Sequence, residues 1–339
     1  MKIGDFKMFK ITVYSVREVE IPLFEKLNKD NFELNLVSEH LSIKNVAKAE
    51  GSDAVLVSGG DDTGKDVLEK IASYGIKLVY TRSVGVDRYD FAAANELGIK
   101  VANVPNYSPR SVAELAFILG MTLFRHVAPA TYNTHMGDFR ILPEYFANEI
   151  HDATVGIIGA GNIGTAEAKL YKALGAKTLA FQRHPDSSND AVEFVDMDTL
   201  LKESDIVSIH VPYIPGKTDN LVGAPELAKM KSSAILVNTA RGPVVDNEAV
   251  AQAVRDFKIG GYGTDVLLDE QHVMDKQFDT LDDVPNQIDK DLMKNYPNVI
   301  VTPHMGFFTV PAVTDMISTS FENFKSTIKT GKPIYPVER

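Results

Sequence analysis

The sequence contains no cysteine. Disulfide bonds, thiolate zinc sites and cysteine nucleophiles are therefore excluded, and with them the thiol-dependent aldehyde dehydrogenases. Long hydrophobic runs are also missing, since none approaches the roughly 18–20 residues that a membrane-spanning helix needs. The first ten residues, MKIGDFKMFK, lack the apolar core of a signal peptide. These absences predict a cytoplasmic protein without a membrane partner.

Basic residues are in the minority, with 35 Lys and Arg against 46 Asp and Glu, for a net charge of −11. Neither basic runs nor alternating aromatic and basic residues occur, so we expect no nucleic-acid partner. A small anionic substrate stays compatible with this charge, because one arginine can dominate a pocket. The 339 residues, 44% of them hydrophobic, suffice for two domains with packed cores.

One stretch of the chain predicts a βαβ unit with a glycine-rich first turn. Thr154–Ile158 is a short apolar run typical of a buried strand, a helical pattern follows the glycines, and Lys177–Phe181 predicts a second strand. In the turn GAGNIG, Gly159 permits a tight bend, Gly161 lets the backbone approach a pyrophosphate, and Gly164 lets the helix pack on the strand. A G-x-G-x-x-G turn alone could be an ordinary turn. In this setting it predicts a dinucleotide site.

The end of the second strand bears on the choice of cofactor. Sites for NAD usually have Asp or Glu roughly 20 residues past the first glycine, where it binds the ribose 2′-hydroxyl. Here the sequence has Gln182, Arg183 and His184. With no carboxylate to repel a 2′-phosphate and an arginine beside it, we favour NADP(H). The alternative is that Arg183 lies on a solvated loop and that NAD(H) binds as well.

Strand and helix patterns alternate along the whole chain, which predicts two doubly wound parallel sheets in the α/β class. Asp269–Asp291 is polar and acidic and is interpreted as an irregular surface excursion. The helical pattern that begins at Val310 is expected to return to the first domain. The remaining predicted strands are Lys10–Val16, Phe32–Val37, Ala54–Ser58, Lys77–Thr81, Lys100–Val104, Ile206–Val211, Ala234–Asn238, Gly261–Val266 and Val299–Thr302.

Three polar residues follow predicted strands and are candidates for chemistry. Arg241 comes after a strand that ends at Asn238, and its planar fork suits a carboxylate. Glu270 follows another strand end, and His304 follows a third. Histidine can exchange protons near neutral pH. Each also has a plain alternative: a surface salt bridge, a solvated acid or a structural histidine. Ligands of doubly wound sheets bind at this edge, which favours the functional interpretation.

Several motifs together resemble the D-2-hydroxyacid dehydrogenase family, most closely its D-lactate and D-2-hydroxyisocaproate dehydrogenase branch. They are VGVD (Val84–Asp87), YSP (Tyr107–Pro109), GAGNIG (159–164), HVP (His210–Pro212), NTARG (238–242), DV and DE between Asp265 and Glu270, and TPH (302–304). The resemblance implies a discontinuous flavodoxin-like substrate domain, residues 1–106 plus 306–339. It further implies a Rossmann cofactor domain, residues 107–305, with a cleft between the two, and a homodimer that uses the long helix after Ser108.

The resemblance also implies residue roles in reversible reduction of a 2-oxo acid to the D-2-hydroxy acid. Arg241 would bind the substrate carboxylate and polarise the ketone, His304 would be the acid and base, and Glu270 would hold the imidazole of His304. No metal is implied. The cofactor would contact Gly159, Gly161, Asn162, Ile163, Gly164, Gln182, Arg183, His184, His210, Val211, Pro212, Thr239, Ala240 and Asp265. The substrate would contact Val84, Gly85, Tyr107, Arg241 and Phe307.

Other functions within and outside this family stay open at this point. A hydroxypyruvate or glyoxylate reductase, or a phosphoglycerate dehydrogenase, would use the same fold. A phosphorylated substrate would need cations, and Arg82, Arg88 and Arg110 are the arginines nearby. The loop Ser58–Asp61 has small residues where lactate enzymes present bulky ones, which leaves the substrate size open. A nucleotide-sensing module without catalysis is a further alternative, although it would not need Arg241, Glu270 and His304 together.

Overall fold

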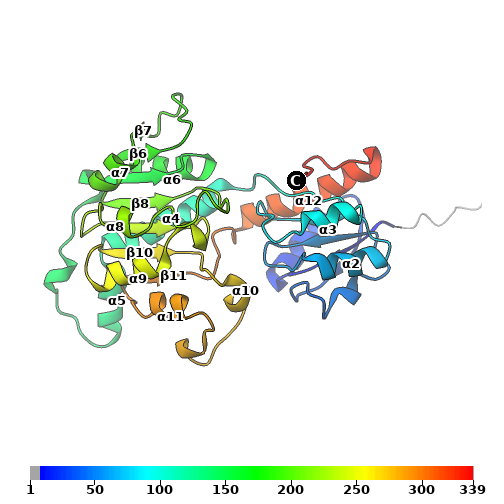
Figure 1. Ribbon diagram of the computed structural model, residues 1–339, viewed down its shortest axis with the longest axis horizontal. Helices are drawn as coiled ribbons and strands as arrows, with labels where there is room; N and C mark the ends of the chain where they lie inside the picture. Colours follow the sequence, from blue (N-terminus) through cyan, green and yellow to red (C-terminus); the bar gives the residue numbers. More distant parts are fainter. Residues whose placement is uncertain (1–7, 339) are drawn as a thin grey trace, which may run out of the picture. The chain divides into compact units, whose positions relative to one another are not determined.

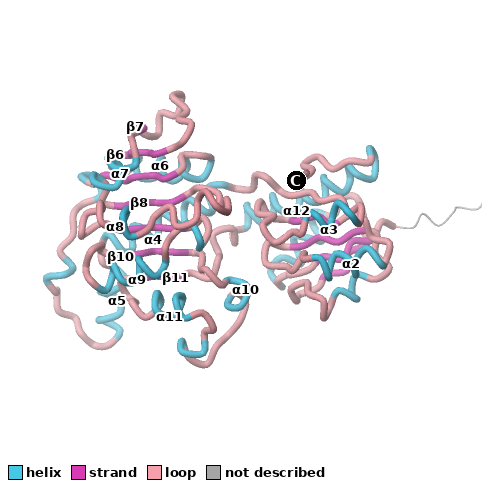
Figure 2. The backbone as a smooth tube through the Cα atoms, in the orientation of Figure 1, coloured by secondary structure: helices cyan, strands magenta, loops and turns pink. Residues whose placement is uncertain are grey.

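The computed structural model describes residues 8–338. Residues 1–7 and residue 339 lie outside the described part. The chain divides into two compact units, and each is described by itself: Met1–Ser108 with Thr309–Arg339, and Pro109–Phe308. Figure 1 labels the elements of both units, and Figure 2 separates their helices, strands and loops by colour.

In its described part, the first unit contains a parallel four-stranded sheet in the order β2-β1-β3-β4. Ile11 of β1 pairs with Leu34 of β2 and with Ala54 of β3. The strands are β1 (Lys10–Val13), β2 (Glu33–Leu36), β3 (Ala54–Val57) and β4 (Val79–Thr81). The helices are α1 (Ile21–Leu27), α2 (Lys65–Ser73), α3 (Phe91–Glu96) and α12 (Val310–Thr330), with 3-10 turns η1 (Glu18–Glu20) and η2 (Val46–Ala49).

Helices cover both faces of this sheet. Alternate residues of β3 point to opposite sides, and all of them are buried. Val55 and Val57 join a cluster that includes residues of α2 and α3. Leu56 joins a second cluster with α1 and α12, in which Tyr80 stacks on Phe324 with ring centroids 4.6 Å apart. The C-terminal helix α12 thus supplies part of the first unit's core.

Two predicted strands of this unit differ from the structure. The strand expected over Lys10–Val16 ends at Val13, because Ser15 adopts a left-handed conformation with φ 58°. Lys100–Val104 is not a named strand. Its backbone accepts hydrogen bonds from Val79 and Thr81 at 3.1 and 2.8 Å, but it pairs through isolated bridges.

Residues 109–308, all described, contain a parallel seven-stranded sheet in the order β11-β10-β9-β8-β5-β6-β7. The strands are β5 (Thr154–Ile158), β6 (Lys177–Phe181), β7 (Glu193–Phe194), β8 (Ile206–Ile209), β9 (Ile235–Asn238), β10 (Gly261–Thr264) and β11 (Val299–Val301). The helices are α4 (Pro109–Phe124), α5 (Val127–His135), α6 (Asn162–Ala173), α7 (Met197–Glu203), α8 (Ala224–Leu227), α9 (Asn247–Arg255), α10 (Glu270–Val273) and α11 (Gln287–Met293). Four 3-10 turns complete the unit: η3 (Pro143–Tyr145), η4 (Ile150–Asp152), η5 (Gly242–Val244) and η6 (Leu281–Asp283).

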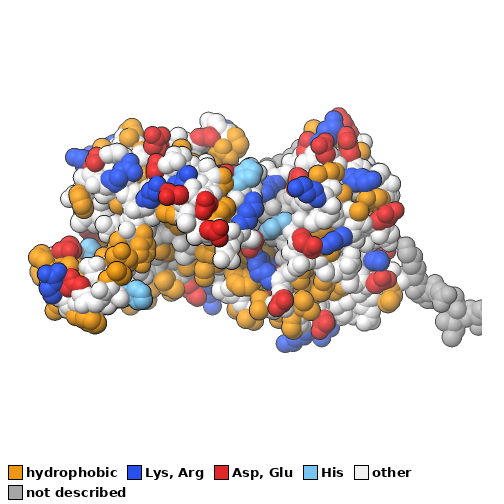
Figure 3. Space-filling view, turned by 90° about the horizontal axis from the view of Figure 1, so that it is seen from below, with side chains coloured by type: hydrophobic (Ala, Val, Ile, Leu, Met, Phe, Trp, Pro, Cys, Tyr) orange, Lys and Arg blue, Asp and Glu red, His pale blue; other side chains and the backbone are white. Residues whose placement is uncertain are grey.

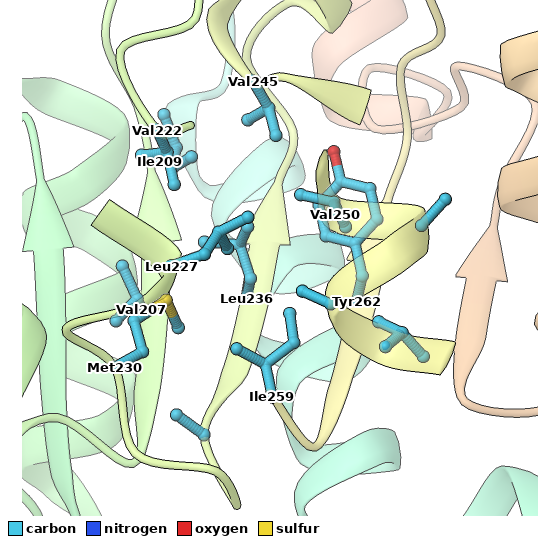
Figure 4. Close-up of a cluster of buried hydrophobic side chains, with 14 of the residues drawn as sticks. Val207, Ile209, Val222, Leu227, Met230, Leu236, Val245, Val250, Ile259 and Tyr262 are labelled. Atoms are coloured by element: carbon cyan, nitrogen blue, oxygen red, sulfur yellow. The ribbon is translucent and has the colours of Figure 1, made fainter. Parts of the chain in front are cut away.

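Both faces of the seven-stranded sheet are buried, as a parallel sheet requires. Ile235 and Val237 of β9 face a cluster that contains residues of α4 and α6. Leu236, between them, faces the opposite cluster, where it packs near Val207 and Tyr262 (Figure 4). The predicted assignment of two doubly wound α/β domains is therefore confirmed for the class of each unit.

The prediction of an irregular segment over Asp269–Asp291 is wrong in its second half. After α10 and η6, the chain forms α11 over Gln287–Met293. Asn286 caps this helix by accepting a hydrogen bond from the amide of Asp289, and Leu292 is fully buried. The acidic composition hides this short helix in the sequence.

In the described part of the chain, no single helix is long and apolar enough to cross a membrane; the bent pair of α4 and α5 passes that test of length and composition only when the two are taken together.

Candidate active site

The predicted site residues of the second unit lie on loops that leave the same edge of the seven-stranded sheet. In parallel strands this is the carboxyl edge, where ligands bind. The glycine turn follows β5, and Gln182 follows β6. Arg241 and His304 follow β9 and β11, on either side of β10. One edge therefore carries both the predicted dinucleotide turn and the predicted catalytic residues.

Close packing explains two of the three glycines in the turn. Gly159 has φ +97°, and a β-carbon on Gly164 would lie 2.3 Å from the carbonyl oxygen of Gly159. A β-carbon on Gly161 would meet no atom of the described chain within 4 Å. Protein packing therefore does not require glycine at 161, whereas close approach of a phosphate would. No side-chain cap hydrogen bond is present at Gly161, the N-cap of α6, and a helix N-terminus of this kind favours an anion.

A cavity of about 800 Å³ lies beside this turn and is lined by residues including Gly161, Asn162 and Gln182. The Nε2 of Gln182 donates to the carbonyl oxygen of His184, 3.1 Å away, which fixes the orientation of the amide. Its Oε1 is buried and has no partner among the described residues. Arg183 and His184 are exposed. A side-chain amide that lines a cavity beside a phosphate-type turn fits the ribose hydroxyls of a dinucleotide.

The residues predicted to contact the cofactor from the loops after β8 and β9 differ in burial and in their hydrogen-bond partners. The imidazole of His210 is 2% exposed and is hydrogen-bonded to the buried carboxylate of Glu167 in α6. Any cofactor contact of His210 must therefore come from its backbone. Val211 packs where a β-carbon of Gly159 would stand. The hydroxyl of Thr239 is buried without a partner in the described chain. Pro212 is exposed, and Ala240 is half-buried with its amide bound to Asn238.

His304 and Glu270 form a hydrogen-bonded pair, with 3.0 Å between Nδ1 and Oε2. The side chain of His304 is 37% exposed and that of Glu270 is 21% exposed. The other carboxylate oxygen of Glu270 accepts from the amide of Leu267 at 3.2 Å. With Nδ1 bound to a carboxylate, the free proton-carrying atom of His304 is Nε2.

The electrostatics of the pair favour a charged imidazole. Burial opposes the charged form of His304, but the hydrogen bond and charge of Glu270 outweigh it, so the pKa of His304 is raised. Burial likewise opposes ionisation of Glu270, yet the contact with His304 leaves the pKa of Glu270 lowered. The charge of Arg241 acts on both groups, assisting ionisation of Glu270 and opposing protonation of His304. These three residues are therefore electrostatically coupled.

Asp265 holds the loop that carries His304. Its carboxylate accepts from the hydroxyl of Thr302 at 2.6 Å and from the amides of Met305 and Gly306, each at 2.8 Å. Burial raises the pKa of Asp265, against the effect of these hydrogen bonds. His304 itself has φ 51°, which is unfavourable for a residue with a β-carbon. The contacts of Asp265 on both sides of His304 hold it in that conformation, a role that the cofactor prediction for Asp265 does not include.

Arg241 lies on a loop that touches the segment before Glu270. The loop is fixed by Asn238, whose side-chain amide donates to the carbonyl of Arg241 at 3.0 Å. A β-carbon on Gly242 would lie 2.1 Å from the carbonyl oxygen of Leu267, so only glycine permits this approach. Phe307 lies near His304, with ring centroids 6.4 Å apart.

In the first unit, the loop after β4 offers two adjacent amides. The carbonyl of Val84 accepts from Asn103 and that of Gly85 accepts from Ser83, each at 2.9 Å. Among the residues that the structure describes, the amides of Val84 and Gly85 have no acceptor. A pair of free amides at a strand end can bind a small anion. Tyr107 is half-buried in the same unit.

No group of His, Cys, Asp or Glu side chains in the described residues could hold a metal ion. The polar groups described at this edge are a hydrogen-bonded histidine and carboxylate, an arginine and a glycine-rich turn.

Comparison with known proteins identifies the family. The sequence model described as "D-isomer specific 2-hydroxyacid dehydrogenase, NAD binding domain" matches residues 117–306. The chain belongs to this family.

Relatives extend the match over nearly the whole chain of this D-2-hydroxyacid dehydrogenase. It is 33% identical to a D-2-hydroxyacid dehydrogenase (NAD(+)) of Clostridioides difficile, covering 95% of this chain and 98% of the relative. It is 34% identical to a D-lactate dehydrogenase of Lactobacillus delbrueckii subsp. bulgaricus, covering 98% and 99%. The crystal structure of D-lactate dehydrogenase with NAD+ from Lactobacillus jensenii gives a TM-score of 0.84 at 37% identity, covering 97% and 100%.

The resemblance inferred from the motifs is therefore confirmed. This protein is an enzyme of the D-2-hydroxyacid dehydrogenase class. It reversibly reduces a 2-oxo acid to the D-2-hydroxy acid with a nicotinamide cofactor. Sequence reasoning missed Glu167, the partner of His210, and Asp289, a buried residue of α11 that binds the segment before Glu270. No local pattern marks either of them, because both act on segments distant in the sequence.

Proposed function

We propose that His304, Glu270 and Arg241 are the catalytic residues of this D-2-hydroxyacid dehydrogenase. The observation that carries the proposal is the 3.0 Å hydrogen bond between His304 and Glu270, at the sheet edge that also carries Arg241 and the glycine turn. The nicotinamide cofactor supplies the hydride. Everything else in the reaction is binding, orientation and proton transfer by the chain.

His304 gives the proton and takes it back. In reduction, Nε2 of the protonated imidazole donates to the carbonyl oxygen of the 2-oxo acid. The neutral imidazole keeps its proton on Nδ1, where it is hydrogen-bonded to Glu270, so the ring keeps its orientation. In the reverse direction, Nε2 accepts the proton of the hydroxyl. Because Glu270 raises the pKa of His304, the acid form persists to higher pH, which favours reduction.

Substrate binding is divided between cations and amides in the proposal. Arg241 binds the carboxylate of the 2-oxo acid and polarises its ketone, and its planar fork suits two parallel hydrogen bonds. The free amides of Val84 and Gly85 support a carboxylate-binding role for the first unit. Tyr107 and Phe307 are proposed to contact the substrate side chain. In this division, residues 1–106 with 306–339 serve the substrate, and residues 107–305 serve the cofactor apart from Arg241 and Tyr107.

For the cofactor, we propose that the enzyme accepts both NAD(H) and NADP(H). The position of Gln182 supports NAD(H), because this residue lines the cavity beside the glycine turn and its side-chain amide can hydrogen-bond to the ribose 2′-hydroxyl. The absence of a carboxylate at that position and the exposed Arg183 support acceptance of a 2′-phosphate. The sequence favoured NADP(H) over NAD(H), whereas the proposal here is that the enzyme accepts both cofactors.

We further propose a homodimer that uses the segment between α4 and β5. Several large apolar side chains of this segment are exposed on the single chain: Met136 is 70% exposed, Phe139 79%, Ile141 94% and Phe146 95%. So much apolar surface in one short stretch is typical of a protein interface. Figure 3 shows that hydrophobic side chains reach the surface of the second unit.

A panel of 2-oxo acids tests the function. Pyruvate, phenylpyruvate, 2-oxoisocaproate, hydroxypyruvate, phosphohydroxypyruvate and glyoxylate would be offered with NADH and NADPH side by side, followed by chiral analysis of every product except glycolate, which has no stereocentre. D-products that require His304 would support the proposal. L-products, or turnover that survives His304→Ala, would contradict it. Turnover of hydroxypyruvate or phosphohydroxypyruvate alone would favour the other branches of the family. The absence of any turnover would favour a sensing module.

A further inference from the structure

Asp289 is a carboxylate placed where an apolar residue is expected. It lies in α11 on the side that faces the core, near Leu292, and its side chain is fully buried. Its Oδ1 accepts from the amide of Leu268 and its Oδ2 from the amide of Asp269, both at 3.2 Å. A buried carboxylate is costly unless hydrogen bonds compensate it. These two amides provide that compensation.

The residues that Asp289 binds come immediately before Glu270. Leu267 donates its amide to Glu270, and its carbonyl oxygen lies against Gly242 of the arginine loop. Glu270 in turn binds His304. The short segment from Leu267 to Glu270 is therefore held on one side by the loop of Arg241 and on the other by Asp289.

We propose that Asp289 is a positioning residue for proton transfer: it fixes the peptide groups before Glu270 so that this carboxylate meets the imidazole of His304. Two amides on one carboxylate define the orientation of two successive peptide planes. Without Asp289, both amides of this half-buried segment would lose their acceptor, and the segment would have to shift to reach another. The inference rests on the proposed function of His304 and Glu270, because Asp289 acts through them.

A purely electrostatic effect is the main competing explanation. Burial and the charges of Asp269 and Glu270 raise the pKa of Asp289, while its two amide hydrogen bonds lower it. His304 itself faces Glu270, Asp265 and Arg241. A substitution of Asp289 could therefore act by removing charge or by releasing the segment, and the variants below separate the two.

The test compares Asp289→Asn and Asp289→Glu with the wild type over a pH series of kcat/KM for reduction. Asn offers one acceptor oxygen for two amides and has no charge, whereas Glu keeps the charge and moves both oxygens by one methylene. We expect kcat of Asp289→Asn to fall about tenfold, as for a buried donor left unpaired. The alkaline limb of its profile should move to lower pH, and that of Asp289→Glu should move in the same direction by less. The Kd for NADH, read from the cofactor's own fluorescence, should stay within about twofold.

Asp205→Asn is a matched control. Asp205 also holds a backbone amide of the second unit, that of Thr154 at 2.9 Å, but it precedes β8 and so lies at the opposite edge of the sheet. Its substitution should lower the melting temperature without moving the pH limb. Melting temperatures of all variants separate a loss of folded protein from a loss of positioning.

A double-mutant cycle with Glu270→Gln decides whether Asp289 acts through Glu270. In the Glu270→Gln background, Asp289→Asn should change kcat by less than about twofold, since the group that it positions is already altered. If the two substitutions lowered kcat independently, so that their fold-changes multiplied in the double variant, the proposal would be overturned. An unchanged alkaline limb of the pH profile in Asp289→Glu would overturn it as well. If Asp289→Asn does not fold, the limb of Asp289→Glu alone gives the answer. Should His304→Ala retain turnover, the proposed function fails; should only the Asp289 variants behave as wild type, this inference alone fails.

Discussion

Replacing Glu270 by Gln tests the proton-transfer pair most directly. Gln has nearly the same shape, so it can still accept the Nδ1 hydrogen bond, but it carries no charge. A hydrogen bond between charged partners contributes about 1.5–3 kcal/mol net. Because the side chain of His304 is 37% exposed, solvent screens the pair and the lower value of about 1.5 kcal/mol applies. At about 1.4 kcal/mol per factor of ten, this corresponds to roughly a tenfold change in protonation of His304.

The sign of the effect follows from the direction of the pKa shift. Glu270 raises the pKa of His304, so removing its charge should lower that pKa; burial and Arg241 then still lower it and Asp265 still raises it. In the proposed mechanism reduction uses protonated His304, so kcat/KM for reduction should fall as pH rises through that pKa. At acidic pH both enzymes have a protonated imidazole and should differ little, whereas the wild type should be about tenfold faster above both pKa values.

The assay is the pH series of kcat/KM for reduction, followed by NADH absorbance under saturating cofactor. Oxidation of the D-2-hydroxy acid, measured in parallel, should extend to lower pH in Glu270→Gln because it needs the neutral imidazole. A ratio of wild type to variant that is independent of pH would refute the reasoning. Such a result would mean that the charge of Glu270 does not control the protonation of His304.

Three further predictions concern the other parts of the site. Arg241→Lys should raise KM and lower kcat together, because a point charge cannot replace the bidentate fork; kinetics equal to the wild type would argue against it. Gln182→Asp should shift the NADPH to NADH ratio of kcat/KM toward NADH by about tenfold or more, since a carboxylate repels the 2′-phosphate, and an unmoved ratio would contradict the cofactor proposal. Ile141→Asp should give a monomer in analytical ultracentrifugation, because a charge would be buried at the proposed interface, whereas an intact dimer would place the interface elsewhere.

The periodic parts of the fold were predictable from the sequence. The bounds of β5 and β6 agree with the predicted Thr154–Ile158 and Lys177–Phe181, because an apolar β-branched strand and a glycine turn are local signals. The helix α11 was not predicted, since its buried face is a single turn with Leu292 and the acidic Asp289 in an otherwise polar stretch. A pattern of hydrophobicity cannot reveal a helix whose inner face carries a carboxylate.

The candidate site likewise has features that the sequence predicts and features that it does not. That Arg241 and His304 each follow a strand could be derived from the sequence, and the sheet order places those strands on either side of β10. The pairing of His210 with Glu167 could not, because their side chains meet from segments 43 residues apart. The sequence also could not distinguish a histidine that points to a ligand from one that points to the core. Side-chain direction depends on how the residue after β8 packs against the middle of α6.

The contact between Gly242 and Leu267 has a consequence for recombining this enzyme with its relatives. The two backbones touch with no room for a methyl group, so each loop is shaped by the other. A chimera with a crossover between residues 242 and 267 would unite loops inherited from different parents at their tightest junction. Exchange of both loops as one cassette, with glycine kept at position 242, preserves that junction, and libraries of hybrids should retain turnover mainly in clones built in that way.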